Sequence, residues 1–472
     1  MHTPNRAALD AHLNYWAEKN NLAGVSAFIM GPDGPVYSWN YGFRDAAGQI
    51  MPDSDTMYGI ASMSKSITAL CACILHCEGR LSIHDPVSRY LPSFSIPGQP
   101  KEAVTLRHLA MHTAGIPPME PLEWSIAMNS VDRSESPWLL SMRRTSPNQM
   151  DKIEHILDYI AACRYRFLGA PGEVMSYSNE GYAILSYAID KAAGMPLEQL
   201  MHERIFAPLG MTRSILDNGI EQSRALSGGN ITSLFEMVNG VRECDDNWSI
   251  LPPFRGCAMV KSTARDIATY YRMLANFGMH EGVQVVPREA VELLCGRYHA
   301  LPELNAMCMG INKRPFEGHI ICEHSGGLHG VSTKGGLLLG EGYGFSVLCN
   351  QGDEDMDELM WGMYNAVMGL PLDKSHRWFN PIGQDFSQPE MICGTYLGHE
   401  GVPSVLTIRE EDGRLVRIRD GAKTEFAYCG GARFLSYDPH KDYDQGVRHE
   451  FLIRDGKAWG VRCGTRVFER ME

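Results

Sequence analysis

Strand-like sequence on both sides of a long helical stretch is the feature that most limits how this chain can fold. Residues 24–45, "GVSAFIMGPDGPVYSWNYGFRD", place short apolar runs around a Pro-Asp-Gly turn, which predicts a hairpin. Strand-like runs return at 335–340 and 343–349. We therefore expect an α+β or α/β domain whose sheet joins the two ends of this part of the chain.

Most of the sequence between these strands has the helical period. Helices are predicted at 61–77, 104–112, 152–163, 180–193, 197–206 and 264–277. Residues 117–149 show little periodicity, and this stretch suits either a long loop over a site or a surface excursion.

The character of the sequence changes after roughly residue 370. A segment rich in proline and polar residues is followed by short alternating runs with Asp-Gly turns, such as "SVLTIREEDGRLVRI" and "EFLIRDGKAWGVR". Several such hairpins in the last part of a chain predict a small antiparallel β-barrel. We expect two domains, at residues 1–375 and 385–472.

Composition limits the kinds of partner. The 472 residues carry a net charge of −13, which disfavours nucleic acid and anionic membranes. The first twenty residues have no apolar run of signal-peptide length, and no apolar stretch is long enough to span a membrane. The odd number of 13 cysteines suits a reducing compartment. We therefore expect a cytoplasmic protein that acts on small molecules.

The helix predicted at 61–77 carries polar side chains where apolar ones are expected. One face holds an apolar stripe, and small residues on the other face favour burial on both sides. Ser62 and Lys65 lie together on that second side, near the helix start. Burial and the helix dipole both disfavour a charged ammonium there, so Lys65 is suited to take a proton from Ser62. For an isolated S-x-x-K the usual alternative is a capping serine and a solvated lysine.

Two more short motifs follow at suitable distances. Tyr177 and Asn179 belong to Y-S-N ahead of a predicted helix, and His324 begins H-S-G ahead of strand-like sequence. Together with S-x-x-K, they resemble the signature of the serine β-lactamase and penicillin-binding-protein superfamily. The chain looks most like its class C β-lactamase-like branch, which includes DD-peptidases, D-aminopeptidases and carboxylesterases. Further matching stretches extend the resemblance over roughly residues 20–352.

The resemblance implies a role for each of these residues. Ser62 would be the acylated nucleophile, Lys65 the amine that activates it, and Tyr177 a general base and acid. The backbone N–H groups of Ser62 and Gly327 would form the oxyanion hole, and Asn179 would hydrogen-bond Lys65 and the substrate amide. The expected substrate-binding residues are Asn179, His324, Ser325, Gly326 and Gly327.

The resemblance also implies a fold. We expect a β-lactamase/transpeptidase-like antiparallel sheet of five or more strands, with helices on one face, a helical lobe beside it, and the site between the two. The tail from about residue 385 looks like the lipocalin-like barrel fused to some members of this group. In such fusions the barrel can limit access to the site or mediate assembly.

Departures from the β-lactamase pattern shape the expected function. His324 replaces the lysine of many β-lactamases, so the group that would grip a substrate carboxylate is expected to titrate near neutrality. This favours DD-peptidases and D-aminopeptidases, and the lack of an export signal weakens a role in the cell wall. We expect a serine hydrolase acting through an acyl-enzyme on a small amide, peptide or ester, most of all a D-aminopeptidase or D-amino acid amidase. A carboxylesterase or acyltransferase, and then a DD-carboxypeptidase or weak β-lactamase, are the alternatives.

No metal or organic cofactor is expected. His108 and His112 lie four apart on a predicted helix, but the chain has no H-E-x-x-H and no paired C-x-x-C. A homo-oligomer is left open. The non-enzyme alternative is an idle protein that binds a peptide or an antibiotic, and the retention of all the reactive residues argues against it.

Overall fold

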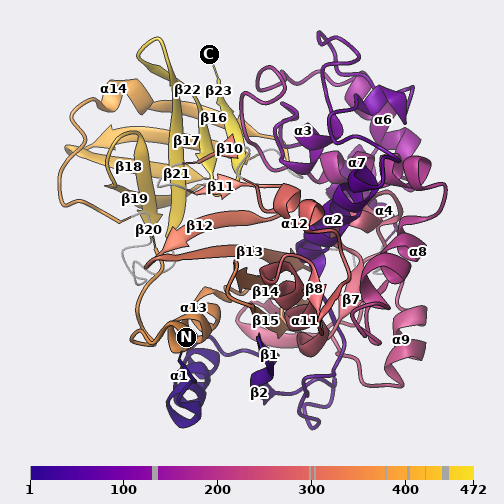
Figure 1. Cartoon of the computed structure of the whole chain (residues 1–472). Coiled ribbons are helices and arrows are strands. Elements are labelled where there is room, and N and C mark those ends of the chain that lie inside the picture. The colour runs from indigo at the N-terminus through magenta and orange to yellow at the C-terminus, as the bar shows by residue number, and fades with distance from the viewer. Residues whose placement is uncertain are drawn as a thin grey trace.

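A sheet of eight antiparallel strands joins the first hairpin of the chain to strands from its second half (Figure 1). The computed structural model describes residues 2–129, 137–296, 299–301, 305–377, 380–400, 404–419, 421–437 and 446–471, and within these the strand order is β10-β11-β12-β13-β14-β15-β1-β2. The strands are β1 (Gly24–Gly31), β2 (Gly34–Gly42), β10 (His299–Ala300), β11 (Ala306–Met307), β12 (Asn312–Phe316), β13 (His319–Leu328), β14 (Val331–Leu338) and β15 (Tyr343–Cys349). The predicted hairpin and the sheet that joins the two ends are confirmed.

Helices make up much of the chain between β2 and β10. They are α2 (Ser64–Cys77), α3 (Leu106–Ala110), α4 (Pro121–Asn129), α5 (Pro137–Thr145), α6 (Ile153–Ala161), α7 (Asn179–Ala193), α8 (Leu197–Met201), α9 (Glu221–Ser227), α10 (Arg255–Ala258), α11 (Ala264–Ala275) and α12 (Arg288–Leu294). Each predicted helix has a counterpart here, and the one predicted at 197–206 continues from α8 as a π-helical turn, η3 (His202–Phe206).

Short elements connect the helices. The 3₁₀ turns are η1 (Ala61–Met63), η2 (Val87–Arg89) and η4 (Pro252–Phe254). Small antiparallel pairs form between β3 (Tyr58–Gly59), β7 (Val260–Ser262) and β4 (Ile215–Leu216), between β5 (Phe235–Val238) and β6 (Val241–Cys244), and between β8 (Met279–His280) and β9 (Val283–Gln284). The turn η1 leads directly into α2 and carries the serine of S-x-x-K.

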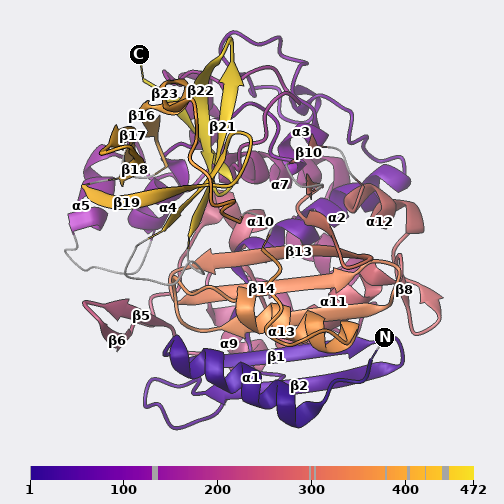
Figure 2. The same ribbon diagram turned by 90° about the vertical axis from the view of Figure 1, so that its left-hand side faces the viewer.

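Helices cover both faces of the eight-stranded sheet, so the prediction of helices on one face was wrong. Figure 2 looks onto the sheet with α1 (Arg6–Lys19) and α13 (Asp357–Met368) in front of it, and α2 and α11 lie behind. Strand β1 is buried along its whole length. Because successive side chains of a strand point to opposite faces, both faces need an apolar partner. Accordingly Val25 belongs to the core beneath α1 and α13, and Phe28 to the core around α2.

Residues 117–149, which the sequence predicted as a loop or surface excursion, hold the helices α4 and α5 in their described part. Trp124 of α4 packs with Leu139 and Met142 of α5 and with Met150. Two helices of nine residues each complete so few turns that their periodicity is hard to detect. Trp124 therefore holds this small pair of helices together.

The helix that carries Lys65 is buried on both sides, as its two apolar faces predicted. Every residue from Ser64 to Leu75 is buried. Helix α2 packs against α7, α8, α10 and α12. Among the described helices none combines the length and apolar character needed to cross a membrane.

The C-terminal part of the chain closes into an eight-stranded antiparallel barrel, as predicted. Its strands are β16 (Gly394–Gly398), β17 (Ser404–Glu411), β18 (Arg414–Arg419), β19 (Ala422–Tyr428), β20 (Arg433–Tyr437), β21 (Val447–Arg454), β22 (Lys457–Cys463) and β23 (Arg466–Arg470), preceded by α14 (Pro389–Ile392). Pairing of β16 with β23 completes the ring. Both hairpins read from the sequence are present, as β17–β18 and β21–β22.

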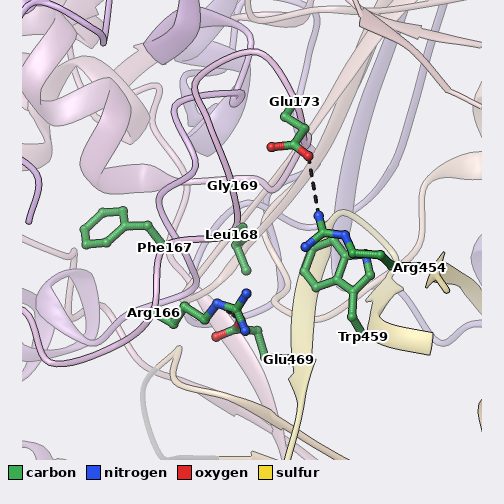
Figure 3. A pocket seen from close by; sticks show the side chains of 8 residues that line it. All are labelled: Arg166, Phe167, Leu168, Gly169, Glu173, Arg454, Trp459 and Glu469. Carbon is green, nitrogen blue, oxygen red and sulfur yellow. Dashed lines mark hydrogen bonds and ion pairs between the residues drawn. The ribbon is translucent and has the colours of Figure 1, made fainter. Parts of the chain in front are cut away.

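The barrel rests against the helical lobe through its strands β21 to β23. An apolar cluster joins the two parts and consists of Leu168, Val174, Leu452, Trp459 and Val467. A cavity of about 380 Å³ adjoins this cluster, and two ion pairs cross it (Figure 3). Arg454 lies 3.4 Å from Glu173, and Arg166 lies 3.8 Å from Glu469. Apolar contact and charge both hold the barrel in place.

Candidate active site

Ser62 and Lys65 lie side by side where η1 passes into α2. The Lys65 Nζ atom is 3.0 Å from Ser62 Oγ and also donates a hydrogen bond to the Cys257 carbonyl at 3.2 Å. The Lys65 side chain is fully buried, with 0% exposure. An amine in this position is placed to accept the hydroxyl proton when the serine attacks a carbonyl.

The backbone just before the serine is held in an unusual conformation. Ala61 has a φ of +44°, a region that non-glycine residues adopt only at a cost. Thr333 Oγ1 donates to the Ile60 carbonyl at 3.1 Å. Gly326 lies so close that a Cβ atom on it would be 2.3 Å from the same carbonyl oxygen. Strand β13 therefore packs directly on the turn that carries Ser62, and only glycine fits at position 326.

The H-S-G segment lies in β13 with its residues facing alternate sides. His324 and Gly326 are buried, whereas Ser325 and Gly327 are exposed. The pairing of β13 with β12 ends at Glu323, and the pairing with β14 continues to the end of the strand. In the described part of the sheet, the backbone after Glu323 is thus paired on one edge, with β14. This stretch of β13 includes Gly327, whose N–H is the expected second donor of the oxyanion hole.

Tyr177 lies beside the other reactive groups. Lys65 Nζ is 4.9 Å from the centroid of the Tyr177 ring, and the His324 ring centroid is 6.1 Å away. The ring is largely buried, with 8% exposure. The structure therefore brings together Ser62, Lys65, Tyr177 and His324, which come from three well-separated stretches of sequence.

His112 holds the Y-S-N segment in place. Its Nδ1 accepts a hydrogen bond from the Ser178 N–H at 3.0 Å, its carbonyl accepts one from the Ser176 N–H at 2.9 Å, and its ring stacks on Tyr177 at 4.1 Å. Burial, with the charge of Lys65, lowers the pKa of His112 well below its usual value, so the ring is neutral. From the sequence, His112 was a candidate only for a metal site shared with His108. Helix α3 ends at Ala110, so the two histidines do not share a helix face.

Asn179 begins α7, next to Tyr177. The Ser178 side chain caps this helix by accepting the Gly181 N–H at 3.0 Å, and the Asn179 carbonyl accepts a hydrogen bond from Cys257 Sγ at 3.2 Å. Among the described residues, Lys65 bonds to Ser62 and to Cys257, and the expected hydrogen bond between Lys65 and Asn179 is not formed. The role of Asn179 in binding the substrate amide stays a prediction.

His324 is a neutral imidazole, so the expectation that it titrates near neutrality was wrong. Burial, with the charge of Lys65, lowers its pKa to about 4. Its Nδ1 lies 2.5 Å from the Ser325 carbonyl oxygen and must carry the hydrogen. Sequence alone could not reveal this, because the shift comes from packing. The position that holds a lysine in many β-lactamases therefore carries no charge.

A cavity of about 630 Å³ opens on the exposed side of β13, and both parts of the chain line it. Ser325 and Gly327 face it from the sheet, and His449 and Thr465 face it from the barrel. Three of the cations that line it are paired: Arg314 with Glu323, Lys334 with Asp357, and Arg462 with Glu450. A substrate that reaches Ser325 would thus be enclosed in part by the barrel.

The β22–β23 turn of the barrel reaches the segment that carries Tyr177. The Thr465 carbonyl accepts the Tyr177 N–H at 2.8 Å, and the Val467 N–H donates to Ser176 Oγ at 3.2 Å. The guanidinium carbon of Arg466 is 4.7 Å from the centroid of the Tyr177 ring. These residues could not be found from the sequence, because the barrel carries no recognisable motif. The one signal available was the expectation that such a barrel can limit access to the site.

Cys71 and Cys73 are buried thiols of α2. Burial raises the pKa of Cys71 and of Cys73 above the usual value for a thiol, which disfavours the thiolate form. In the part of the chain that the structure describes, no three side chains of histidine, cysteine, aspartate or glutamate converge closely enough to bind a metal ion.

Known proteins resemble this chain in sequence and in fold. A family model described as "Beta-lactamase" matches residues 9–367. D-alanyl-D-alanine-carboxypeptidase/endopeptidase AmpH of Escherichia coli is 27% identical over 219 residues, which are 46% of this chain and 51% of that protein. Across the curated relatives considered, the chain spans 37% to 51% of their length.

Solved structures resemble the chain in fold. The octameric penicillin-binding protein homologue from Pyrococcus abyssi is 20% identical with a TM-score of 0.68, covering 98% of this chain and 100% of that one. The D-stereospecific amidohydrolase from Streptomyces sp. is also 20% identical, with a TM-score of 0.62, and covers 78% of this chain and 100% of its own. The first similarity extends over the barrel as well as the sheet and its helices.

Proposed function

The chain belongs to the beta-lactamase family, and from this premise we propose that it is a serine hydrolase that forms an acyl-enzyme on Ser62. The observation that carries the proposal is the 3.0 Å hydrogen bond between Ser62 Oγ and the buried amine of Lys65. A solvated surface lysine, which is the usual outcome for an isolated S-x-x-K, would not be buried in this way.

The proposed reaction uses the residues in turn. Lys65 takes the Ser62 proton as the serine oxygen bonds to the substrate carbonyl carbon. The N–H groups of Ser62 and Gly327 stabilise the oxyanion of the tetrahedral intermediate. Tyr177 passes a proton to the leaving nitrogen or oxygen as its bond to carbon breaks, and it then accepts a proton from the water that attacks the acyl-enzyme. The bond between Ser62 Oγ and the acyl carbon then breaks, Lys65 returns its proton to Ser62 Oγ, and the acid is released.

The proposed substrate is a small amide or peptide with a D-residue on the acyl side. A carboxypeptidase must hold the free carboxylate of its substrate, and a fixed cation in the H-S-G segment suits that task. His324 is neutral at that position, and Lys334 on the neighbouring strand is paired with Asp357. These features favour a D-aminopeptidase or D-amino acid amidase over a DD-carboxypeptidase. The resemblance in fold to a D-stereospecific amidohydrolase is consistent with this choice.

Initial rates on D- and L-alanine p-nitroanilide and on p-nitrophenyl butyrate test the proposal. We expect the D-amide to be preferred and Ser62→Ala to abolish turnover. Ser66→Ala is the matched control, because its hydroxyl is buried nearby in α2, where it donates to the Met63 carbonyl at 2.9 Å and accepts from the Tyr270 hydroxyl at 3.3 Å. Near-normal hydrolysis by Ser62→Ala would end the proposal. Activity on the ester alone would instead support a carboxylesterase or acyltransferase.

The remaining proposals concern the setting of the enzyme. We propose a cytoplasmic protein with domains at residues 1–375 and 385–472 that assembles as a homo-oligomer. The octameric state named for the Pyrococcus abyssi homologue supports assembly. Sedimentation analysis of the purified chain checks this, and a monomer at micromolar concentration would contradict it.

A further inference from the structure

The barrel brings the charged side chain of Arg466 next to Tyr177 in the candidate active site. Arg466 directly follows the β22–β23 turn, and its guanidinium carbon is 4.7 Å from the centroid of the Tyr177 ring. We propose that Arg466 is a positioning residue for Tyr177, so that the barrel is a working part of the active site. This inference rests on the acyl-transfer role proposed above for Tyr177.

Main-chain hydrogen bonds show how firmly the barrel engages the tyrosine. The consecutive N–H groups of Ser176, Tyr177 and Ser178 are all hydrogen-bonded, at 2.9, 2.8 and 3.0 Å. The outer two bond to His112 of the catalytic part, whereas the middle one bonds to the Thr465 carbonyl of the barrel. The backbone of Tyr177 is thus fixed by both parts of the chain at once.

Two more contacts from the barrel strengthen this attachment. Arg462 Nε donates to the Met175 carbonyl at 3.1 Å, two residues before Tyr177. The Val467 N–H bonds to Ser176 Oγ. Arg462, Thr465, and Val467 together bind three successive residues of the segment, and Arg466 is held among them. Its side chain therefore has a defined place beside the phenol ring.

The guanidinium of Arg466 is itself held. Its Nη2 lies 2.7 Å from Glu400 Oε1, and its Nη1 donates to Thr465 Oγ1 at 3.2 Å. Burial lowers the pKa of Arg466, but the charge and hydrogen bond of Glu400, with the nearby Tyr177 and Glu180, together raise it above its usual value, so the side chain remains a cation. Because 29% of the side chain is exposed, the site can also be reached by small ions from solution.

Carboxyl groups surround this cation. Burial, with a smaller contribution from the charge of Glu400, raises the pKa of both Glu123 and Glu180 to about 7, and the charge of Arg466 opposes this rise. Glu180 is three residues from Tyr177 and bonds to Ser178 Oγ at 3.1 Å. Arg466 and Lys65 are cations beside the Tyr177 ring, at 4.7 and 4.9 Å from its centroid. Arg466 thus adds positive charge, on the side of these carboxyl groups, next to a phenol that is proposed to pass on its proton during acyl transfer.

Arg466→Met and Arg466→Lys test the proposal on the full chain. We expect Arg466→Met to lower kcat by about 30-fold with KM changed less than about threefold, because the residue acts through Tyr177 and not on substrate binding. Arg466→Lys, which restores the charge, should return kcat to within about fivefold of the unmodified chain. Added methylguanidinium should recover part of the kcat of Arg466→Met.

Arg454→Met is the matched control. Arg454 comes from the same barrel and pairs with Glu173 across the interface with the helical lobe. We expect its kcat to stay within about twofold of the unmodified chain. If Arg466→Met does not fold, Arg466→Gln, which keeps hydrogen-bonding groups without the charge, replaces it under the same expectation.

The outcomes separate this proposal from the proposed function. A kcat within twofold for Arg466→Met overturns the positioning role, and so does an equal loss in Arg454→Met, because docking of the barrel would then be what matters. A failure of Arg466→Lys to recover activity overturns it as well. Full activity in Ser62→Ala would overturn the proposed function instead.

Discussion

The Y-S-N segment is held from two sides that differ in their chemistry. On the catalytic side, His112 is hydrogen-bonded to the segment and Lys65 lies beside the Tyr177 ring. Both side chains are deeply buried, and His112 is neutral. On the barrel side, Arg466 is a partly exposed cation paired with Glu400. Loss of one partner from a buried hydrogen bond leaves the other unsatisfied, whereas partly exposed ion pairs contribute little each. Substitutions on the catalytic side should therefore cause large losses, and substitutions on the barrel side should cause smaller ones.

The largest effect should come from Lys65→Met, which fills the same space without the amine. We expect kcat to fall by about 10³-fold or more, because proton transfer from Ser62 is lost. Lys261→Met is the matched control, since Lys261 is also buried and donates to the Gly219 carbonyl at 2.7 Å. That variant should lose stability but retain kcat. A kcat for Lys65→Met within tenfold of that of the unmodified chain would contradict the role expected for Lys65.

His112 offers a graded test of the same side. His112→Phe keeps an aromatic ring but loses the acceptor for the Ser178 N–H, and we expect a fall in kcat of about 100-fold and a loss of stability of about 1–3 kcal/mol. His112→Asn supplies an oxygen acceptor and tolerates the φ of +58° at this position. The kcat of His112→Asn should stay within about tenfold of that of the unmodified chain. Equal losses in both variants would show that the hydrogen bond is not what matters.

The interior of the barrel should respond to acid. Burial lowers the pKa of His449 to about 3, below the value of an unfolded histidine. The unfolded chain therefore binds a proton between about pH 6.5 and 3 that the folded barrel excludes, so stability falls as the pH falls through this range. We expect His449 to cost about 3 kcal/mol on going from pH 7 to pH 4.

Chemical denaturation of His449→Asn at the two pH values measures this cost. The variant cannot titrate at this position, so its stability should fall by about 3 kcal/mol less than that of the unmodified chain over the same range. Parallel losses in the two proteins would mean that His449 is exposed to protons in the folded state.

The smallest effect should come from the ion pair between Arg454 and Glu173. Both side chains are about half exposed, at 50% and 49%. We expect Glu173→Gln to lower the free energy of unfolding by less than about 1 kcal/mol at low salt. The difference should vanish at about 0.5 M salt, where exposed charges are screened. A larger loss of unfolding free energy that does not depend on salt would show that the barrel interface behaves like the buried contacts of the catalytic side.

The sequence predicted the catalytic side far better than the barrel side. Ser62 and Lys65 are three residues apart where η1 continues into α2, so their spacing fixes their geometry. The contact of Tyr177 with the barrel is made by the Thr465 carbonyl, a backbone group that every residue possesses, and it therefore leaves no signature. The neutrality of His324 depends on burial by distant segments. The hydrophobic patterns likewise predicted the sheet but not α1 and α13. Burial of β1 on both faces requires these helices, and that burial also depends on distant segments.

The place of β1 in the sheet has a consequence for synthesis of the protein. Strand β1 pairs with β2 on one edge and with β15 on the other. A ribosome that adds about 5–20 residues each second needs roughly 15–60 s to make the segment between β2 and β15. During that time the first hairpin has left the exit tunnel with one edge unpaired, which invites pairing with other nascent chains. Translation that pauses before residue 343 would prolong this exposure, and chaperone binding to the emerging N-terminal hairpin would protect it.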